Sequence, residues 1–340
     1  MQTIHRQGTR LLFVLFICLQ TTACSGWDPL INAKHKNDRL PDQSSTASEL
    51  STVIPQKSFP EITQPPKSPE QSWIVNAIEA KQMLEQGATL LDARGSTLIK
   101  KRLQGAIAVN WEQFSDRDSV TRGKLLENDD QLTQQLQALG ISSDKPVVVF
   151  GDAPDGWGED GRIVWMLRTL GHPQTVMVDG GFQALIEAKV PLQQEKGHSP
   201  QAGNFVIKRD LTWDIQRDDL RQKLGSDNLV IIDARQPREF NGKTPYGERR
   251  GGHLPGAINL YFRDFRGDNG QLLARQEILA KLHNVGITPE TQLVVYCTAG
   301  VRSGWLTSVL VDLGFQAKNY AGSMWEWSAA PAEYFPLETH

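Results

Sequence analysis

The chain has 340 residues, which is too long for one ordinary domain, so two domains are expected. Hydrophobic residues make up 39% of the chain and charged residues 22%, and the formal net charge is −3, as in many soluble globular proteins. This near-neutral balance lacks the basic excess of nucleic-acid-binding proteins, so a nucleic-acid partner is not expected.

The first residues have the pattern of an export signal. Arg6 and Arg10 precede an apolar run over 11–19, and small residues follow up to Ala23. Such a segment is typical of a secretory signal and is too short to span a bilayer permanently. We predict a signal peptide over 1–23 and an exported, periplasmic protein.

Cys24 follows this segment directly. The small residues and Cys24 together resemble the bacterial lipobox, in which the cysteine is lipidated and becomes the mature N-terminus. We therefore predict a lipid on Cys24 as the only link to a membrane. Thr21 departs from the aliphatic residue usual in that motif, and simple cleavage after Ala23 is the alternative. Residues 24–70 are polar and proline-containing, with few aromatics, and are predicted to be a disordered tether.

The cysteine count singles out one thiol. Of the three cysteines, Cys18 lies in the signal and Cys24 at its end, which leaves Cys297 in the folded part. Cys297 ends a β-branched run and is followed by a short loop with Gly300 and a helical pattern. Backbone N–H groups and the helix dipole make such a loop a binding site for anions. The same positive potential lowers the pKa of a thiol placed there. A nucleophile is predicted; a buried structural cysteine is the alternative.

An internal repeat with a period of about 145 residues organises the rest of the chain. The sequence over 90–94 recurs at 231–235, and that over 146–151 matches 292–297. The repeat predicts two domains, over 71–196 and 205–335. Within each, β-rich runs alternate with helical patterns, which predicts an α/β fold with a mostly parallel central sheet flanked by helices. The helices are expected at 77–86, 129–139, 162–170, 218–224, 276–284 and 303–313.

The two copies differ where chemistry is expected. Only the second has Cys297, and the first has Gly151 at the matching position. The segment after Gly151 is three residues longer than the segment after Cys297, and its loop is acidic. Its negative charge would occupy the place of an anion, so the first domain is predicted to be inactive.

Several motifs together resemble the tandem-domain rhodaneses, the family of thiosulfate and 3-mercaptopyruvate sulfurtransferases. They are the segments 164–168, 179–182, 252–259, 297–302 and 322–327. The resemblance implies that Cys297 carries sulfur as a persulfide from a small donor such as thiosulfate to a thiophilic acceptor such as cyanide or a thiol. A thiol redox protein is a candidate acceptor, and neither a cofactor nor a metal is implied.

The resemblance also implies roles for the loop and nearby basic residues. Loop N–H groups would stabilise the thiolate and the persulfide, from Thr298, Ala299, Gly300, Val301 and Ser303. Arg302 would bind the donor's sulfonate; its alternative is a salt bridge that stiffens the loop. Arg250 would add positive potential at the mouth, or belong to a solvated basic turn.

Loop details limit the choice of substrate. Four residues separate Cys297 from Arg302, one fewer than in the related phosphatases, and this suits a sulfur atom better than a phosphate. The family's substrate-binding arginine aligns with Glu239, one residue after Arg238, the candidate replacement. The predicted function is thiosulfate sulfurtransferase. The alternatives are 3-mercaptopyruvate sulfurtransferase and a non-enzymatic sulfur carrier that docks a partner.

Overall fold

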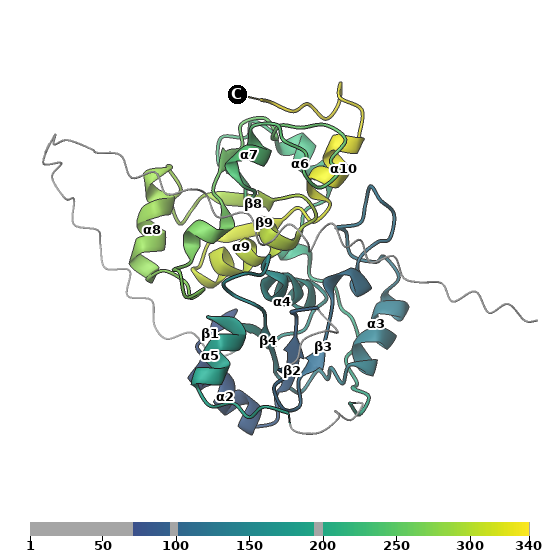
Figure 1. The fold of residues 1–340 in the computed structure, drawn as a ribbon. Helices are drawn as coiled ribbons and strands as arrows, with labels where there is room; N and C mark the ends of the chain where they lie inside the picture. Colours follow the sequence, from purple (N-terminus) through teal and green to yellow (C-terminus); the bar gives the residue numbers. More distant parts are fainter. Residues whose placement is uncertain (1–70, 96–100, 194–199, 340) are drawn as a thin grey trace, which may run out of the picture. The chain divides into compact units, whose positions relative to one another are not determined.

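Each half of the chain is built on one parallel β-sheet (Figure 1). The computed structural model describes residues 71–95, 101–193 and 200–339. All of these belong to one compact unit. The predicted signal peptide, Cys24 and the predicted tether lie outside the described residues. Within those residues, no helix has both the length and the apolar character that crossing a bilayer requires.

The first half has a five-stranded sheet with the strand order β1-β5-β4-β2-β3. Its strands are β1 (Ile74–Val75), β2 (Thr89–Asp92), β3 (Ile107–Ala108), β4 (Val147–Phe150) and β5 (Thr175–Val178). Its helices are α2 (Ala77–Glu85), α3 (Asp129–Ala138), α4 (Glu159–Thr169) and α5 (Gly181–Glu187), with the 3-10 turn η2 (Trp111–Phe114).

The second half has a four-stranded sheet with the strand order β7-β6-β8-β9. Its strands are β6 (Leu229–Asp233), β7 (Ile258–Asn259), β8 (Gln292–Tyr296) and β9 (Gln316–Asn319). Its helices are α6 (Arg217–Lys223), α7 (Pro237–Phe240), α8 (Arg275–Asn284), α9 (Val301–Asp312) and α10 (Ser323–Ala329), with 3-10 turns η3 (Leu211–Trp213) and η4 (Phe262–Phe265).

Strand register shows that the two halves share one plan. Asp92 pairs with Phe150 in the first sheet, and Asp233 pairs with Tyr296 in the second. In each case the central strand ends there, and the next residue is Gly151 or Cys297. The central strands are buried on both faces, as parallel strands covered by helices must be. The predicted fold class is therefore confirmed.

Two predicted helices begin earlier than their apolar pattern. α4 begins at Glu159 rather than at 162, and α9 begins at Val301 rather than at 303. Each follows a left-handed glycine, Gly158 or Gly300. A glycine accepts this conformation without steric cost, so the chain turns there and the helix starts at the next residue. The apolar pattern marks the buried helix face and misses the polar first turn of α4.

Helices α4 and α9 pack against each other and join the halves. From Asp160 to Thr169 and from Val301 to Leu310, every residue is buried, as expected for helices surrounded by protein. A Cβ at Gly161 would lie 2.6 Å from Trp305 Cα, so this glycine permits the close approach of the helices. Side chains of both helices belong to one hydrophobic core.

Candidate active site

Cys297 is the first residue after β8, at the carboxyl end of the second sheet, where α/β proteins bind their ligands. It is a free thiol with 1% of its surface exposed. Gly300 has a φ of 75° and ends the loop, and a Cβ on it would lie 2.6 Å from Ala321 O. Only glycine fits this tight turn, so the loop leads directly into α9.

The segment that opens α10 holds the loop in place. The N–H of Met324 donates to Cys297 O, and the N–H of Trp325 donates to Thr298 O, both over 3.1 Å. The Ser323 hydroxyl accepts from the N–H of Cys297 over 3.1 Å. A trans peptide directs its N–H opposite to its C=O. Anchoring these carbonyls from outside therefore fixes the direction of the loop's N–H groups.

The surroundings of Cys297 favour the thiolate. Burial raises the pKa of the thiol, but the positive charge of Arg302, the Ser303 hydroxyl and the N–H groups of Ser303 and Ala299 lower it by more. The Ser303 hydroxyl donates to Cys297 Sγ over 3.4 Å. The net effect is a pKa below the ordinary value of 9.0. A larger share of the sulfur is then a nucleophile at neutral pH.

Ser303→Ala removes one donor to the sulfur. We expect the thiol pKa to rise and alkylation of Cys297 at neutral pH to slow by about two- to tenfold, the usual contribution of one hydrogen bond. The measurement is the pH dependence of the alkylation rate. Ser308→Ala is the control, because this buried serine on α9 bonds main-chain oxygens of Gly161 and Gly304 instead. Equal effects of the two variants would contradict a role for Ser303 at the sulfur.

Arg302 lies in a buried ion pair. Its guanidinium donates to both carboxylate oxygens of Glu239, over 2.7 and 2.8 Å, and to the Thr298 hydroxyl over 2.7 Å. Burial opposes the charge on Glu239, but Arg302 outweighs it and holds the pKa of this carboxyl below its ordinary value. The Thr298 hydroxyl also lies 3.2 Å from oxygens of Glu239 and Glu248. The loop is thus stiffened by a salt bridge, and donor binding by Arg302 stays a prediction.

The other two basic residues proposed from the sequence are Arg238 and Arg250. Arg238 is exposed on α7, one residue before the buried Glu239. Arg250 donates to four main-chain oxygens, of Ser328, Trp327, Ala330 and Phe335, and so holds the end of α10 and the segment after it. These contacts explain the position of Arg250 structurally. Donor binding by either arginine stays a prediction.

Two aromatic side chains that were not predicted from the sequence, Trp157 and Tyr246, lie beside Arg302. The Trp157 ring lies 4.9 Å from the Arg302 guanidinium and edge-on to Tyr246 at 5.5 Å. Trp325 Nε1 donates to Tyr246 O over 3.0 Å. Trp157 belongs to the loop of the first half that is longer by three residues. That insertion was the signal that could have identified it.

The matching position of the first half is filled by a carboxylate. Asp160 is the second residue of α4, as Arg302 is of α9, so the helix position has the opposite charge. A Cβ on Gly151 would lie 2.8 Å from Asp160 Cγ. Burial raises the pKa of Asp160, whereas Arg266 counteracts that rise. The space that the cysteine side chain and its sulfur would need is occupied.

Gly151→Cys tests whether this half can be reactivated. We expect the chain to lose about 1–3 kcal/mol in its free energy of unfolding, because the new side chain overlaps Asp160. After incubation with a sulfur donor, the intact mass is expected to increase by one sulfur atom per chain, as in the unchanged protein. Two added sulfur atoms would show that Asp160 does not block the first half.

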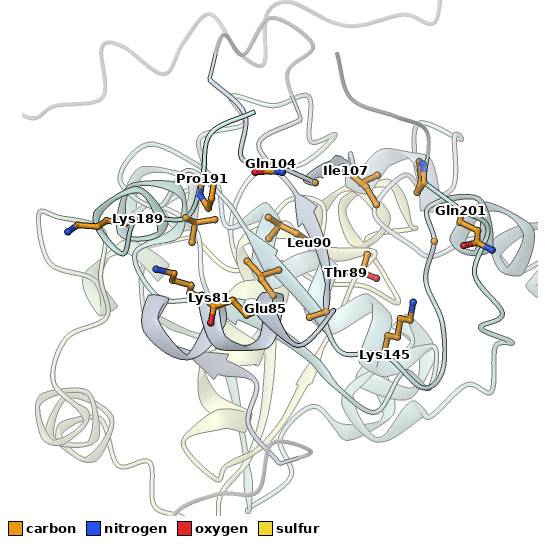
Figure 2. Close-up of a pocket in the computed structure, with 16 residues that line it drawn as sticks. Lys81, Glu85, Thr89, Leu90, Gln104, Ile107, Lys145, Lys189, Pro191 and Gln201 are labelled. Carbon is orange, nitrogen blue, oxygen red and sulfur yellow. The ribbon is translucent and has the colours of Figure 1, made fainter. Parts of the chain in front are cut away.

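A cavity of about 610 Å³ lies elsewhere, in the first half (Figure 2). Its lining includes Thr89 at the start of β2 and Lys145 just before β4, so it is at the amino ends of the strands. No residue of the predicted site lines it. Among the described residues, no group of three or more histidine, cysteine, aspartate or glutamate side chains could hold a metal ion.

Comparison with known proteins agrees with this geometry. The Rhodanese-like domain profile matches residues 76–188 and 216–330. A thiosulfate sulfurtransferase of Azotobacter vinelandii is 32% identical over 203 residues, which cover 59% of this chain and 73% of that one. The 3-mercaptopyruvate sulfurtransferase of Mus musculus is 26% identical over 244 residues, covering 68% and 81%.

The crystal structure of SseA from Escherichia coli has the same fold. It superposes with a TM-score of 0.64 at 21% identity and covers 74% of this chain and 98% of that one. Three findings point to the same family: the profile matches both domains, one relative is more than 30% identical, and a cysteine lies at the carboxyl end of the second sheet. This protein therefore belongs to the rhodanese family, has two rhodanese-like domains of which the second carries the cysteine, and is a sulfurtransferase.

Proposed function

We propose that this protein transfers the outer sulfur of thiosulfate to a thiophilic acceptor through a persulfide on Cys297. The thiolate attacks the outer sulfur, the sulfur–sulfur bond of thiosulfate breaks, and sulfite leaves with the bonding electron pair. The acceptor, cyanide or a thiolate, then attacks the terminal sulfur of the persulfide. With cyanide, thiocyanate leaves and the Cys297 thiolate is restored, so atoms and charge balance in both steps.

The observation that carries this proposal is a buried thiol in a loop with fixed N–H groups, whose surroundings lower the pKa of the thiol. A soft thiolate is the nucleophile that sulfur transfer requires. In this proposal the same N–H groups stabilise negative charge on the terminal sulfur. The name of the Azotobacter relative supports thiosulfate as the donor.

A second donor, 3-mercaptopyruvate, is favoured by the charges at the site. Arg302 is ion-paired with Glu239. The loop has the uncharged residues Thr298 and Ala299 at positions where basic side chains would add positive charge. A donor with two negative charges gains little from such a site. In this alternative the thiolate takes sulfur from 3-mercaptopyruvate, and the pyruvate enolate leaves and gains a proton. The name of the mouse relative supports it.

Side-by-side kinetics decide between the donors. Thiocyanate formation is measured with cyanide as acceptor and either donor, and kcat/KM is compared. A higher value with thiosulfate supports the proposal, and a higher value with 3-mercaptopyruvate replaces it with the alternative. Poor turnover with both donors, together with a stable added sulfur atom on the intact protein, would instead favour a sulfur carrier that hands its sulfur to a protein such as a thiol redox partner.

The proposal includes export to the periplasm and a lipid on Cys24. Its support is the charged start, the apolar run over 11–19 and the small residues before Cys24. The test expresses the full chain in a bacterium fed with labelled fatty acid and follows the label and the cell fraction. Label in the unchanged protein but not in Cys24→Ala supports lipidation. An exported, unlabelled chain would indicate simple cleavage, and a chain retained in the cytoplasm would overturn export.

A further inference from the structure

A second buried arginine reaches the catalytic loop from the half that lacks the cysteine. Arg162 lies on α4 with 1% of its surface exposed. Its Nη1 donates to the main-chain oxygen of Gly300 over 3.3 Å, across 138 positions of the sequence. Its Nη2 donates to Gly123 O over 2.7 Å and to the Ser115 hydroxyl over 3.2 Å. The ring of Trp165 lies 4.5 Å from the guanidinium.

The bonded oxygen belongs to the peptide that begins α9. Gly300 O accepts from Arg162 and also from Asn319 Nδ2 over 3.3 Å and from the N–H of Gly304 over 3.1 Å. Because the peptide is trans, these donors fix the direction of the Val301 N–H on its other side. That N–H is among the first amides of the helix, which have no partner within the helix. Arg162 therefore orients an amide of the anion-binding loop.

Arg162 also supplies charge. Burial lowers the pKa of its guanidinium to about 10, while the Cys297 thiolate and Asp214 act to raise it. The side chain is therefore positive at neutral pH. By reciprocity, a positive charge that the thiolate stabilises must itself stabilise the thiolate. Arg302 also lies on the loop, where it is paired with Glu239, and Glu248 contacts the loop through Thr298.

We propose that Arg162 is a positioning residue through which the half without the cysteine orients the catalytic loop and brings a second positive charge to it. The inference rests on the proposed persulfide function, because it explains how that reaction uses the half without a cysteine. On this inference the first half contributes to the reaction as well as to the packing of the protein. No contact between Arg162 and a substrate is involved.

The chain offers a matched control in Arg168. This arginine is also on α4, is 5% exposed, and donates to the main-chain oxygens of Thr175, Pro173 and Ser72. These three oxygens belong to the first half, so Arg168 resembles Arg162 in its burial and its bonding to main-chain oxygens but holds a different part of the fold. Arg168→Met thus reports the general effect of removing a buried arginine from α4.

The test compares Arg162→Met and Arg168→Met in the full chain. The alkylation rate of Cys297 is measured against pH by peptide mass spectrometry, and thiocyanate formation is measured in parallel. We expect Arg162→Met to slow alkylation at neutral pH by about threefold or more and to move the midpoint of the profile to higher pH. Arg168→Met is expected to leave the midpoint unchanged, even where it lowers the melting temperature as much.

Arg162→Lys is a second variant that keeps the positive charge. It keeps the proposal testable if Arg162→Met does not fold. Its alkylation midpoint is expected close to that of the unchanged protein, with a lower kcat, because lysine lacks the fork that bonds three groups. An unchanged midpoint in Arg162→Met, or equal displacements in Arg162→Met and Arg168→Met, would overturn the proposal. Alkylation needs no sulfur transfer, so failure of the proposed function would appear separately, as absent turnover in the unchanged protein.

Discussion

Cys297→Ser is expected to abolish sulfur transfer, with a loss of about a thousandfold or more in thiocyanate formation. Serine has nearly the same shape, so the loop and its bonds to α10 should persist. Its hydroxyl stays protonated at neutral pH and forms no bond to sulfur that an acceptor can readily reverse. The loss therefore arises from the missing thiolate rather than from a disturbed fold.

The measurement combines thiocyanate formation with intact-mass analysis after incubation with thiosulfate. The unchanged protein should gain the mass of one sulfur atom, and Cys297→Ser should gain none. Circular dichroism and melting temperature serve as controls for folding. Substantial residual transfer, or sulfur retained on the variant, would show that another group carries the sulfur.

The second large effect is expected on stability, at the buried pair of Arg302 and Glu239. Arg302→Met leaves the Glu239 carboxylate buried without its main partner, and Glu239→Gln leaves the Arg302 guanidinium in the same state. Each is expected to lower the free energy of unfolding by about 3–5 kcal/mol. The double variant should lose less than the sum of the single losses, because it leaves no unpaired buried charge.

Chemical denaturation of the four proteins in this cycle measures the coupling, and additive losses would contradict it. The pH dependence provides a second check. Since the pKa of Glu239 in the folded state is below its ordinary value of 4.5, the stabilisation is present above that pH and is lost as the pH falls through the folded-state pKa. Glu239→Gln should therefore show a weaker loss of stability in acid than the unchanged protein.

The pair also explains why Glu239 is compatible with the loop. The resemblance to the family led us to expect an arginine at the position of Glu239. In the structure its carboxylate is the partner of Arg302, and the same carboxylate lies beside the Thr298 hydroxyl. The acid thus belongs to the architecture of the loop. The consequence for donors is that the guanidinium of Arg302 is already paired with a carboxylate.

The sequence alone was enough to predict the α/β class and the duplication, and it singled out Cys297 as the candidate nucleophile. These features depend on local patterns: β-branched runs, helical periodicity, and two copies that differ at Gly151 and Cys297. Five of the six predicted helices match the observed bounds to within two residues. The exception, α4, begins three residues early because Gly158 caps a polar first turn that contributes little to the apolar pattern.

Only the tertiary structure decided which side chains meet at the loop. Trp157 and Arg162 are more than a hundred residues from Arg302 and Gly300 in sequence, and they reach them because α4 and α9 pack together. No local pattern encodes such a pairing, since it depends on the crossing of two buried helices and on Gly161, which lets them approach. The sequence determined which residue supplies the thiol of the candidate site, and the packing of the two halves decided which charged side chains contact its loop.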